Sequence, residues 1–334
     1  MTKHKLKIKL LGLCGWLSFK WRRLPPGVYC FNYHRIGDPN VDDFDPNVFS
    51  ASVEEFESQL QLLKQHFNII SVDELVIMTK SGAPLTDRYA VITFDDGYID
   101  NYTNAYPLLK KHNIKAAFYV PIHYIDHPQI PWWDEIAWLV NNTTKTTIKL
   151  NSWTQGVALN IGTKKMAIRR VLEAIKKDSS VSMATKLEEL RTVANITMPE
   201  QIKNKPLFMN WQQLKTMSDE KMHIGSHGCS HNILSYLSEQ DQIDEVVNSK
   251  ERIEQQLNIK VTSLAYPVGK KYTFNDLTMR VTKDAGYTLA FSYITGVIGS
   301  LAPNKRFQLQ RIPVDFNSSK EHLKYMIISS KVST

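Results

Sequence analysis

The chain has 334 residues, which is enough to form one large α/β domain whose core needs no disulfides. Charged residues make up 22% of the sequence and hydrophobic residues 43%, so extensive disorder is excluded. The net charge of +8 suits anionic partners, but no zinc-finger spacing, RNP-like signature or long Lys/Arg run accompanies it, and nucleic acid is therefore not an expected partner.

Residues 1–24 form a basic segment around a short apolar stretch, residues 10–19. That stretch is too short to cross a bilayer, which takes about 20 residues, and it runs into Lys20-Trp21-Arg22-Arg23, where a signal peptide would have small residues. The helical spacing of its leucines predicts an amphipathic helix, which either lies on an anionic membrane or packs on its own domain. The leucines are Leu6, Leu10, Leu13 and Leu17.

The cysteine pattern bears on the compartment. The three cysteines, Cys14, Cys30 and Cys229, show no C-x-x-C spacing, which favours a reducing environment over a secreted disulfide framework. We therefore expect a cytoplasmic protein, peripheral at the inner membrane surface if the N-terminal helix binds lipid.

In residues 25–334, short β-rich runs alternate with helical patterns, as in an α/β fold. Strands are predicted at 28–33, 67–71, 89–94, 116–120, 222–225, 262–265, 288–292 and 308–314. Short strands in this order predict a distorted (β/α) barrel of about seven or eight strands.

Helices are predicted between these strands. Residues 53–66 carry an apolar face of Phe56, Leu60 and Leu63 after a serine cap at Ser50 or Ser52. A second helix, residues 238–257, has a predicted buried stripe of Ile243, Val246, Val247, Ile253 and Leu257. Between about residues 131 and 205 the patterns are mainly helical, which predicts a helical insertion between two barrel strands.

Two adjacent carboxylates, Asp95 and Asp96, stand where a predicted strand ends. The apolar run 91–94 leads directly into them, and Gly97 follows. Reactive groups in parallel α/β folds collect at the carboxyl ends of strands, and adjacent acids repel each other unless a cation or a proton relieves the repulsion. The pair therefore indicates either a reactive site or a turn that caps the next helix.

Two histidines, His227 and His231, follow another predicted strand. If the chain turns helical there, a spacing of four residues places both imidazoles on one face, as two ligands of one metal require. Two histidines and one carboxylate leave positions open for water, the pattern of catalytic zinc. We therefore predict that Asp96, His227 and His231 hold a divalent metal, with zinc expected, and that Asp95 is free to act as a base.

These residues resemble the signatures of the polysaccharide deacetylase family, carbohydrate esterase family four (the NodB homology domain). Residues 93–97 are similar to its first signature, residues 226–231 to its second, and Tyr-Pro-Val-Gly at 266–269 to a third that ends Pro-x-Gly. The resemblance covers roughly residues 28–125 and 205–315. It implies metal-dependent deacetylation of N-acetylated glycans with Asp95 as general base and with the backbone N–H of Val268 at the oxyanion.

The later motifs of the family are missing. Ala265 stands where the family commonly has an arginine, and neither Asp-x-x-Asp-Trp nor a terminal Leu-x-His is present. The site is then degenerate or completed by other residues. His34, in a Tyr-His-Arg-Ile run typical of one branch, is a candidate general acid, or else it is bonded to a loop. Arg311, on the last strand, is a candidate partner of Asp95, or else it forms a structural ion pair on the barrel wall.

Trp133, near the start of the insertion, offers either a platform for a sugar or an anchor for the inserted helices. We expect an N-deacetylase acting on a polysaccharide, oligosaccharide or lipid-linked precursor of the cell envelope. The alternatives are an O-acetyl esterase, which the same metal and base would serve, and a glycan-binding protein whose catalytic site has decayed. The oligomeric state stays open.

Overall fold

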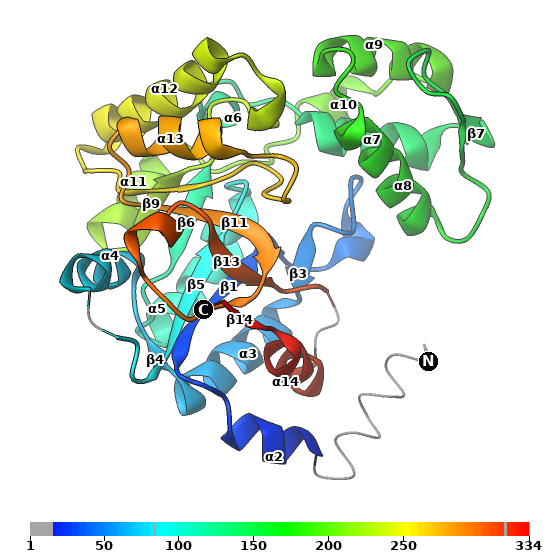
Figure 1. The fold of residues 1–334 in the computed structure, drawn as a ribbon. Helices are drawn as coiled ribbons and strands as arrows, with labels where there is room; N and C mark the ends of the chain where they lie inside the picture. The colour runs from blue at the N-terminus through cyan, green and yellow to red at the C-terminus, as the bar shows by residue number, and fades with distance from the viewer. Residues whose placement is uncertain (1–15, 83, 317–318, 334) are drawn as a thin grey trace. The chain divides into compact units, whose positions relative to one another are not determined.

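The computed structural model describes residues 16–82, 84–316 and 319–333, and the chain divides into two compact units (Figure 1). The first unit contains residues 1–37, 49–126 and 208–334, and the second contains residues 38–48 and 127–207. Most of the predicted N-terminal helix lies outside the described residues. Within the ranges that the structure describes, no helix is both long enough and apolar enough to span a bilayer.

Seven parallel strands close a barrel in the first unit. Around the ring they are β1 (Gly27–Tyr33), β13 (Leu309–Pro313), β11 (Leu289–Thr295), β10 (Ser263–Ala265), β9 (His223–Ser226), β6 (Ala117–Val120) and β5 (Arg88–Phe94). The ring closes because β5 pairs with β1 from end to end. The predicted barrel is confirmed. The remaining predicted strand, β4 (Asn68–Ile69), pairs only with the start of β5 and is not part of the ring.

The barrel strands are buried along most of their length, because both of their faces are covered. All residues of β1, β6 and β9 are buried, as expected for parallel strands that have side chains inside the barrel and helices outside it. In Figure 1 the helices of this unit lie around the strands. They are α2 (Trp16–Arg22), α3 (Val53–His66), α4 (Val72–Ser81), α5 (Tyr106–Lys111), α6 (Ile122–Asp126), α11 (Trp211–Asp219), α12 (Glu239–Leu257), α13 (Asp276–Asp284) and α14 (Lys320–Ser329).

Two of these helices test the sequence patterns in detail. Helix α3 begins and ends where predicted, and Ser52 caps it in a capping box with Glu55. Helix α12 has Ser238 as its N-cap, but its buried face is rotated from the predicted stripe: Ile243 and Val247 are only half-buried. The buried residues of α12 are Gln242, Glu245, Val246, Ser249, Ile253 and Leu257.

Short strands complete the first unit. They are β2 (Arg35–Ile36), which pairs with β3 (Phe49–Ala51), and β12 (Val297–Ile298), which pairs with β14 (Val332–Ser333) and with β1.

The second unit is mainly helical. It contains α7 (Trp132–Asn142), α8 (Lys164–Lys177), α9 (Met183–Ala194), α10 (Glu200–Lys203) and a hairpin of β7 (Thr147–Ile148) and β8 (Val157–Ala158). Residues 38–48 belong to the same unit, and Lys205 forms an ion pair with Asp43 there. The sequence analysis did not predict that residues 38–48 join this unit, since the two segments are far apart in the chain.

Candidate metal centre

The barrel brings the predicted site residues together from the ends of different strands. Asp95 and Asp96 directly follow the last residue of β5, and His227 directly follows the last residue of β9. Both strands pair in parallel with β6. Their carboxyl ends therefore lie at the same end of the barrel, where parallel barrels place reactive groups.

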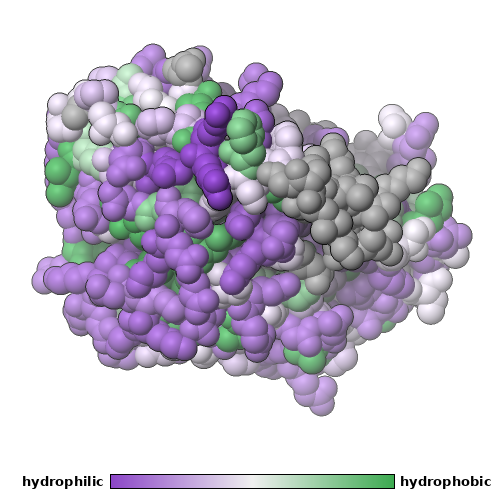
Figure 2. Space-filling view, turned by 90° about the horizontal axis from the view of Figure 1, so that it is seen from below, coloured by the Kyte–Doolittle hydropathy of each residue, from purple (hydrophilic) through white to green (hydrophobic). Residues whose placement is uncertain are grey.

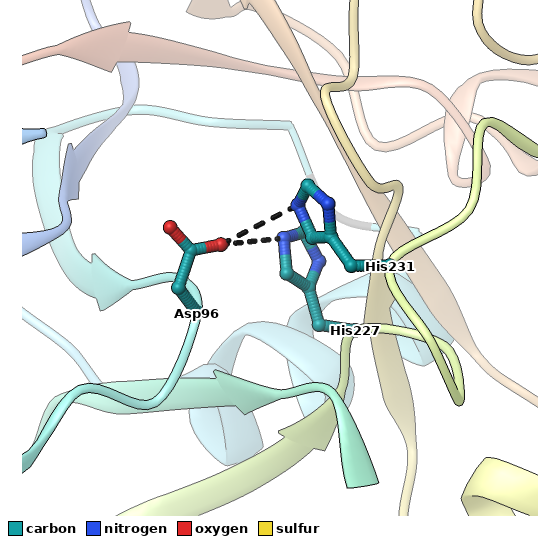
Figure 3. Close-up of side chains that lie close together, drawn as sticks. All are labelled: Asp96, His227 and His231. Carbon is teal, nitrogen blue, oxygen red and sulfur yellow. Dashed lines mark ion pairs between the residues drawn. The ribbon is translucent and has the colours of Figure 1, made fainter. Parts of the chain in front are cut away.

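Asp96, His227 and His231 converge on one point (Figure 3). The Oδ1 atom of Asp96 lies 3.4 Å from the Nε2 atom of each histidine, and the three ligand atoms lie within 4.8 Å of one another. All three residues are buried. Tetrahedral ligands placed about 2.0–2.1 Å from zinc lie roughly 3.3 Å apart. The side chains therefore have the donor types and the spacing that a divalent metal requires.

The backbone around these ligands adopts left-handed conformations. The φ angle is 73° at Asp96, 74° at Gly97, 76° at Gly228 and 56° at His231. Residues with a Cβ are strained in this region, and such strain is concentrated at functional sites. The segment from His227 to His231 is a loop rather than a helical turn. The helical spacing considered for the two histidines is therefore wrong, because the loop itself aims both rings at Asp96.

One hydrogen bond fixes the tautomer of His227. Its Nδ1 atom lies 2.7 Å from the carbonyl oxygen of Ala265. Because a carbonyl oxygen only accepts, Nδ1 must carry the proton, and the lone pair of Nε2 faces Asp96. Burial acts to lower the pKa of His227, but Asp95 and then Asp96 outweigh it and raise the pKa. Asp95 and Asp96 thus stabilise the positively charged form of His227.

Arg311 holds Asp95 by paired hydrogen bonds. Its Nη1 donates to Oδ1 at 2.8 Å and its Nη2 to Oδ2 at 2.7 Å, and Asn32 Nδ2 donates to Oδ2 at 3.1 Å. Arg311 is 1% exposed and Asp95 is 3% exposed. Burial acts to raise the pKa of Asp95, but Arg311 and then His227 outweigh it, so the pKa lies below its ordinary value. Asp95 is therefore held ionised and in one orientation.

His34 and Asp95 follow the paired ends of two neighbouring strands, β1 and β5. His34 is half-buried, and its backbone is fixed by Ser50 Oγ, which accepts from its N–H at 3.0 Å, and by Asn101 Nδ2, which donates to its carbonyl at 2.6 Å. Burial acts to raise the pKa of Asp96, but His227 first and His34 next bring it well below its ordinary range. His34 is thus close enough to act electrostatically on the site.

Val268 follows β10 with a φ angle of 62°. A β-branched residue rarely adopts this left-handed conformation. Within the described ranges, no backbone oxygen accepts a hydrogen bond from its N–H. The backbone N–H of Val268 is therefore available to donate a hydrogen bond, and the backbone that holds it is strained.

Trp133 belongs to the second unit and is 4% exposed. A tryptophan with so little exposed surface is better suited to anchor the inserted helices than to stack against a sugar.

No sequence pattern assigned a role to Asn32, which lies on β1 two residues before His34, the residue that follows the strand. Residues two apart on a strand share a face, so this alternation was the signal that could have found it.

Comparisons with known proteins identify related sequences. The sequence profile described as polysaccharide deacetylase matches residues 82–177 and 183–290, more than half of the chain. YxkH of Bacillus subtilis (strain 168), a polysaccharide deacetylase homologue, is 21% identical over 258 residues, which are 77% of this chain and 61% of that protein. A poly-β-1,6-N-acetyl-D-glucosamine N-deacetylase of Staphylococcus aureus (strain MSSA476) is 33% identical over 99 residues, 27% of this chain and 34% of that enzyme. The chain thus spans less than two thirds of the length of these relatives.

Solved structures share the fold. The Streptococcus pyogenes deacetylase PplD in complex with acetate superposes with a TM-score of 0.60 at 19% identity, over 91% of this chain and 99% of that one. IcaB from Ammonifex degensii superposes with a TM-score of 0.56 at 16% identity, over 91% and 98% of the two chains. Because the family profile matches more than half of this chain, the chain belongs to the polysaccharide deacetylase family.

Proposed function

We propose that this chain is a metal-dependent hydrolase that removes acetyl groups from N-acetylated sugars of a polysaccharide, oligosaccharide or lipid-linked glycan. The observation that carries the proposal is the buried cluster of Asp96, His227 and His231 beside a second, ionised carboxylate, Asp95. Relatives named for N-deacetylation of poly-β-1,6-N-acetyl-D-glucosamine support an acetylated amino-sugar polymer as the substrate class.

The donor set supports zinc as the metal. Two imidazole nitrogens and one carboxylate oxygen suit zinc and leave a coordination position for water. A divalent metal held there lowers the pKa of a bound water and polarises an acetyl carbonyl.

The chain's own residues would then perform the remaining steps. Asp95 takes a proton from the attacking water, and Arg311 keeps that carboxylate ionised and oriented. The N–H of Val268 donates to the oxyanion of the tetrahedral state. His34 gives a proton to the departing amine, which is otherwise a poor leaving group.

Acetate release tests this proposal. The purified protein is incubated with N-acetylated oligosaccharides with zinc, with a chelator, and with the chelator followed by zinc. We expect acetate only when zinc is present. Faster release from O-acetylated than from N-acetylated glycans would favour the esterase alternative. Glycan binding without acetate release under all three conditions would contradict catalysis and favour a decayed binding protein.

We also infer that the N-terminal segment brings the enzyme to an anionic membrane on the cytoplasmic side. Leu17 and Trp21 of α2 are buried, and Trp21 packs against Phe67, so the helix has a fixed inner face. Its outer face exposes Phe19, which is 50% exposed, together with Lys20 and Arg22. On the face shown in Figure 2, hydrophobic residues are scattered among hydrophilic ones, and no broad hydrophobic patch is visible on the described residues. Charge therefore supports membrane binding better than apolar area does.

Charge reversal tests this inference without removing the buried residues of α2. Replacing Lys20, Arg22 and Arg23 by glutamate should weaken binding to phosphatidylglycerol vesicles by more than about 1 kcal/mol per residue, because each change removes an attraction of that size and adds a repulsion. Acetate release from a soluble oligosaccharide should stay the same. Unchanged vesicle binding would show that the described part of the segment is merely structural.

A further inference from the structure

A buried carboxylate outside the metal cluster holds the loop that carries two of the ligands. Glu245, on α12, is 7% exposed. Its Oε2 atom accepts hydrogen bonds from the backbone N–H of Cys229 at 2.6 Å and of Ser230 at 3.1 Å. Its Oε1 atom accepts from Nδ2 of Asn232 at 2.9 Å. One side chain thus binds three residues that lie between His227 and His231 or directly after them.

Helix α6 also binds this loop. The N–H of Ile122 donates to the carbonyl of Gly228 at 3.3 Å, and the N–H of His123 donates to the carbonyl of Cys229 at 2.9 Å. The loop therefore presents acceptors to α6 and donors to Glu245. The fit is close, because a Cβ at Gly228 would lie 2.9 Å from Glu245 Oε2.

Loss of the carboxylate would leave these donors without their acceptor. Cys229 and Ser230 are half-buried, and an N–H that loses its acceptor there must find another one. The loop would therefore relax toward water or other partners. His231 lies one residue beyond Ser230, in a strained left-handed conformation, and its ring must meet Asp96 within 3.4 Å. Relaxation of the loop would therefore move a metal ligand.

We propose that Glu245 is a positioning residue for the metal centre: it fixes the loop of residues 228–232 so that His231 meets His227 and Asp96 at one point. Its hydrogen bonds go to residues beside the ligands and not to the ligands themselves. Outer partners of metal ligands typically change metal affinity by about 10- to 100-fold. This inference rests on the metal-dependent function proposed above.

Helix α12 offers a matched control. Gln242 is 1% exposed and lies three residues before Glu245. It donates to the carbonyl of Leu237 at 3.2 Å and accepts from Thr278 at 2.7 Å, away from the loop of residues 228–232. Glu245→Ala and Gln242→Ala thus each remove a buried polar side chain of one helix, but only the first releases the loop.

The experiment measures zinc binding by the full-length, metal-stripped protein in competition with a chromophoric chelator, together with the absorption spectrum of the cobalt-loaded protein. Glu245→Ala should raise the dissociation constant for zinc by about 10- to 100-fold and change the cobalt bands. Gln242→Ala should lower the melting temperature while leaving both readouts at their wild-type values. Glu245→Gln should recover most of the affinity, because one amide oxygen can accept both backbone N–H groups while the Asn232 amide turns to pair with the new NH2 group.

Wild-type zinc affinity and cobalt spectrum in Glu245→Ala would overturn the inference while leaving the proposed function standing. If that variant does not fold, Asn232→Ala decides: a weaker zinc affinity supports the role of the loop, and an unchanged one overturns it. A wild-type protein without affinity for zinc would overturn the proposed function and this inference together.

Discussion

Two histidines at opposite ends of strand β9 show how the same residue types serve different purposes within one barrel. His223 begins the strand, and its ring nitrogens lie 2.9 Å from the Asp73 carboxylate and 2.8 Å from Ser263 Oγ. His227 follows the strand, and its Nε2 lies 3.4 Å from Asp96. Both histidines are buried beside an aspartate. Of the two, only His227 shares its neighbouring carboxylate oxygen, Asp96 Oδ1, with another histidine, His231.

A histidine beside an aspartate therefore does not by itself define a metal site. Both ring nitrogens of His223 are within hydrogen-bonding distance of protein groups, which leaves no lone pair for a metal. The separation of 3.4 Å at His227 is long for a hydrogen bond and suits two ligands of one ion. At the carboxyl end of the barrel, Asp96, His231 and Val268 have left-handed backbone conformations. That end is where barrels place catalysis, whereas the other end contributes stability.

The largest difference that we expect between variants at the two ends of the barrel is loss of the metal. His231→Ala removes a ligand, so bound zinc and acetate release should disappear together. His223→Ala should keep both and only lower the melting temperature, because it leaves Asp73 and Ser263 without their buried partner. Metal analysis and an acetate assay on the two variants check this. Loss of zinc in His223→Ala would contradict the distinction between the metal-binding end of the barrel and the end that contributes stability.

Asp95→Asn should have the next largest effect, with the metal kept. An amide cannot take a proton from water, and the loss of a positioned base typically lowers the rate by about 10²- to 10⁴-fold. Zinc content should stay at the wild-type level, since Asp95 lies outside the cluster of three ligands. A fall in zinc content parallel to the fall in rate would instead assign Asp95 as a ligand.

The sequence could predict these residues because they stand next to strand ends in the chain itself. Asp95 and Asp96 end an apolar run, and His227 follows another. Spacing alone did not choose the ligands, because His223, His227 and His231 follow one another at intervals of four residues. The strand-end rule and the family signatures made that choice. The barrel was predicted from the order of the short strands in the chain.

The buried polar residues of α12 could not be predicted, because they contact surfaces that meet only in the fold. Periodicity on α12 counts apolar side chains, yet Gln242, Glu245 and Ser249 are buried there, and Glu245 and Ser249 pair with groups of neighbouring segments. No local pattern distinguishes a buried Glu245 from an exposed glutamate. Arg311, by contrast, could be predicted to lie near Asp95. It stands on the last strand, and the first and last strands of a closed barrel are adjacent.

The buried pair of Arg311 and Asp95 predicts an effect on stability that depends on pH. Removing one partner of a buried ion pair typically costs about 3–5 kcal/mol, so Arg311→Met should lower the free energy of unfolding by that order. In the wild type the pKa of Asp95 is lowered, so its contribution is fully present above the unfolded pKa and is lost only as pH falls through the folded value. In the variant burial remains without the guanidinium, so the pKa rises and the variant loses stability as pH rises.

Urea unfolding of the metal-free proteins at about pH 5 and about pH 7 checks the sign. The difference between wild type and Arg311→Met should be larger at the higher pH. A difference that is the same at both pH values would show that Arg311 stabilises the barrel by packing alone, as a wall residue would.

His34→Ala should give the smallest effect, and one that is selective for the leaving group. Expelling an amine requires a proton, whereas an activated acetyl ester loses its leaving group without one. The variant should therefore lower the rate on an N-acetylated sugar by about 10²-fold and the rate on the ester far less. Zinc content should not change, because His34 is not one of the three converging ligands.

The matched variant for this test is Asn101→Ala, which removes the donor to the His34 carbonyl and leaves the imidazole in place. If His34 is the acid, Asn101→Ala should reduce the same ratio of amide to ester rates in part, because the imidazole is less well placed but still present. His223→Ala, at the other end of the barrel, should leave the ratio unchanged. Equal losses on both substrates in His34→Ala would show that this residue shapes the site without donating the proton, and another group would then have to protonate the amine.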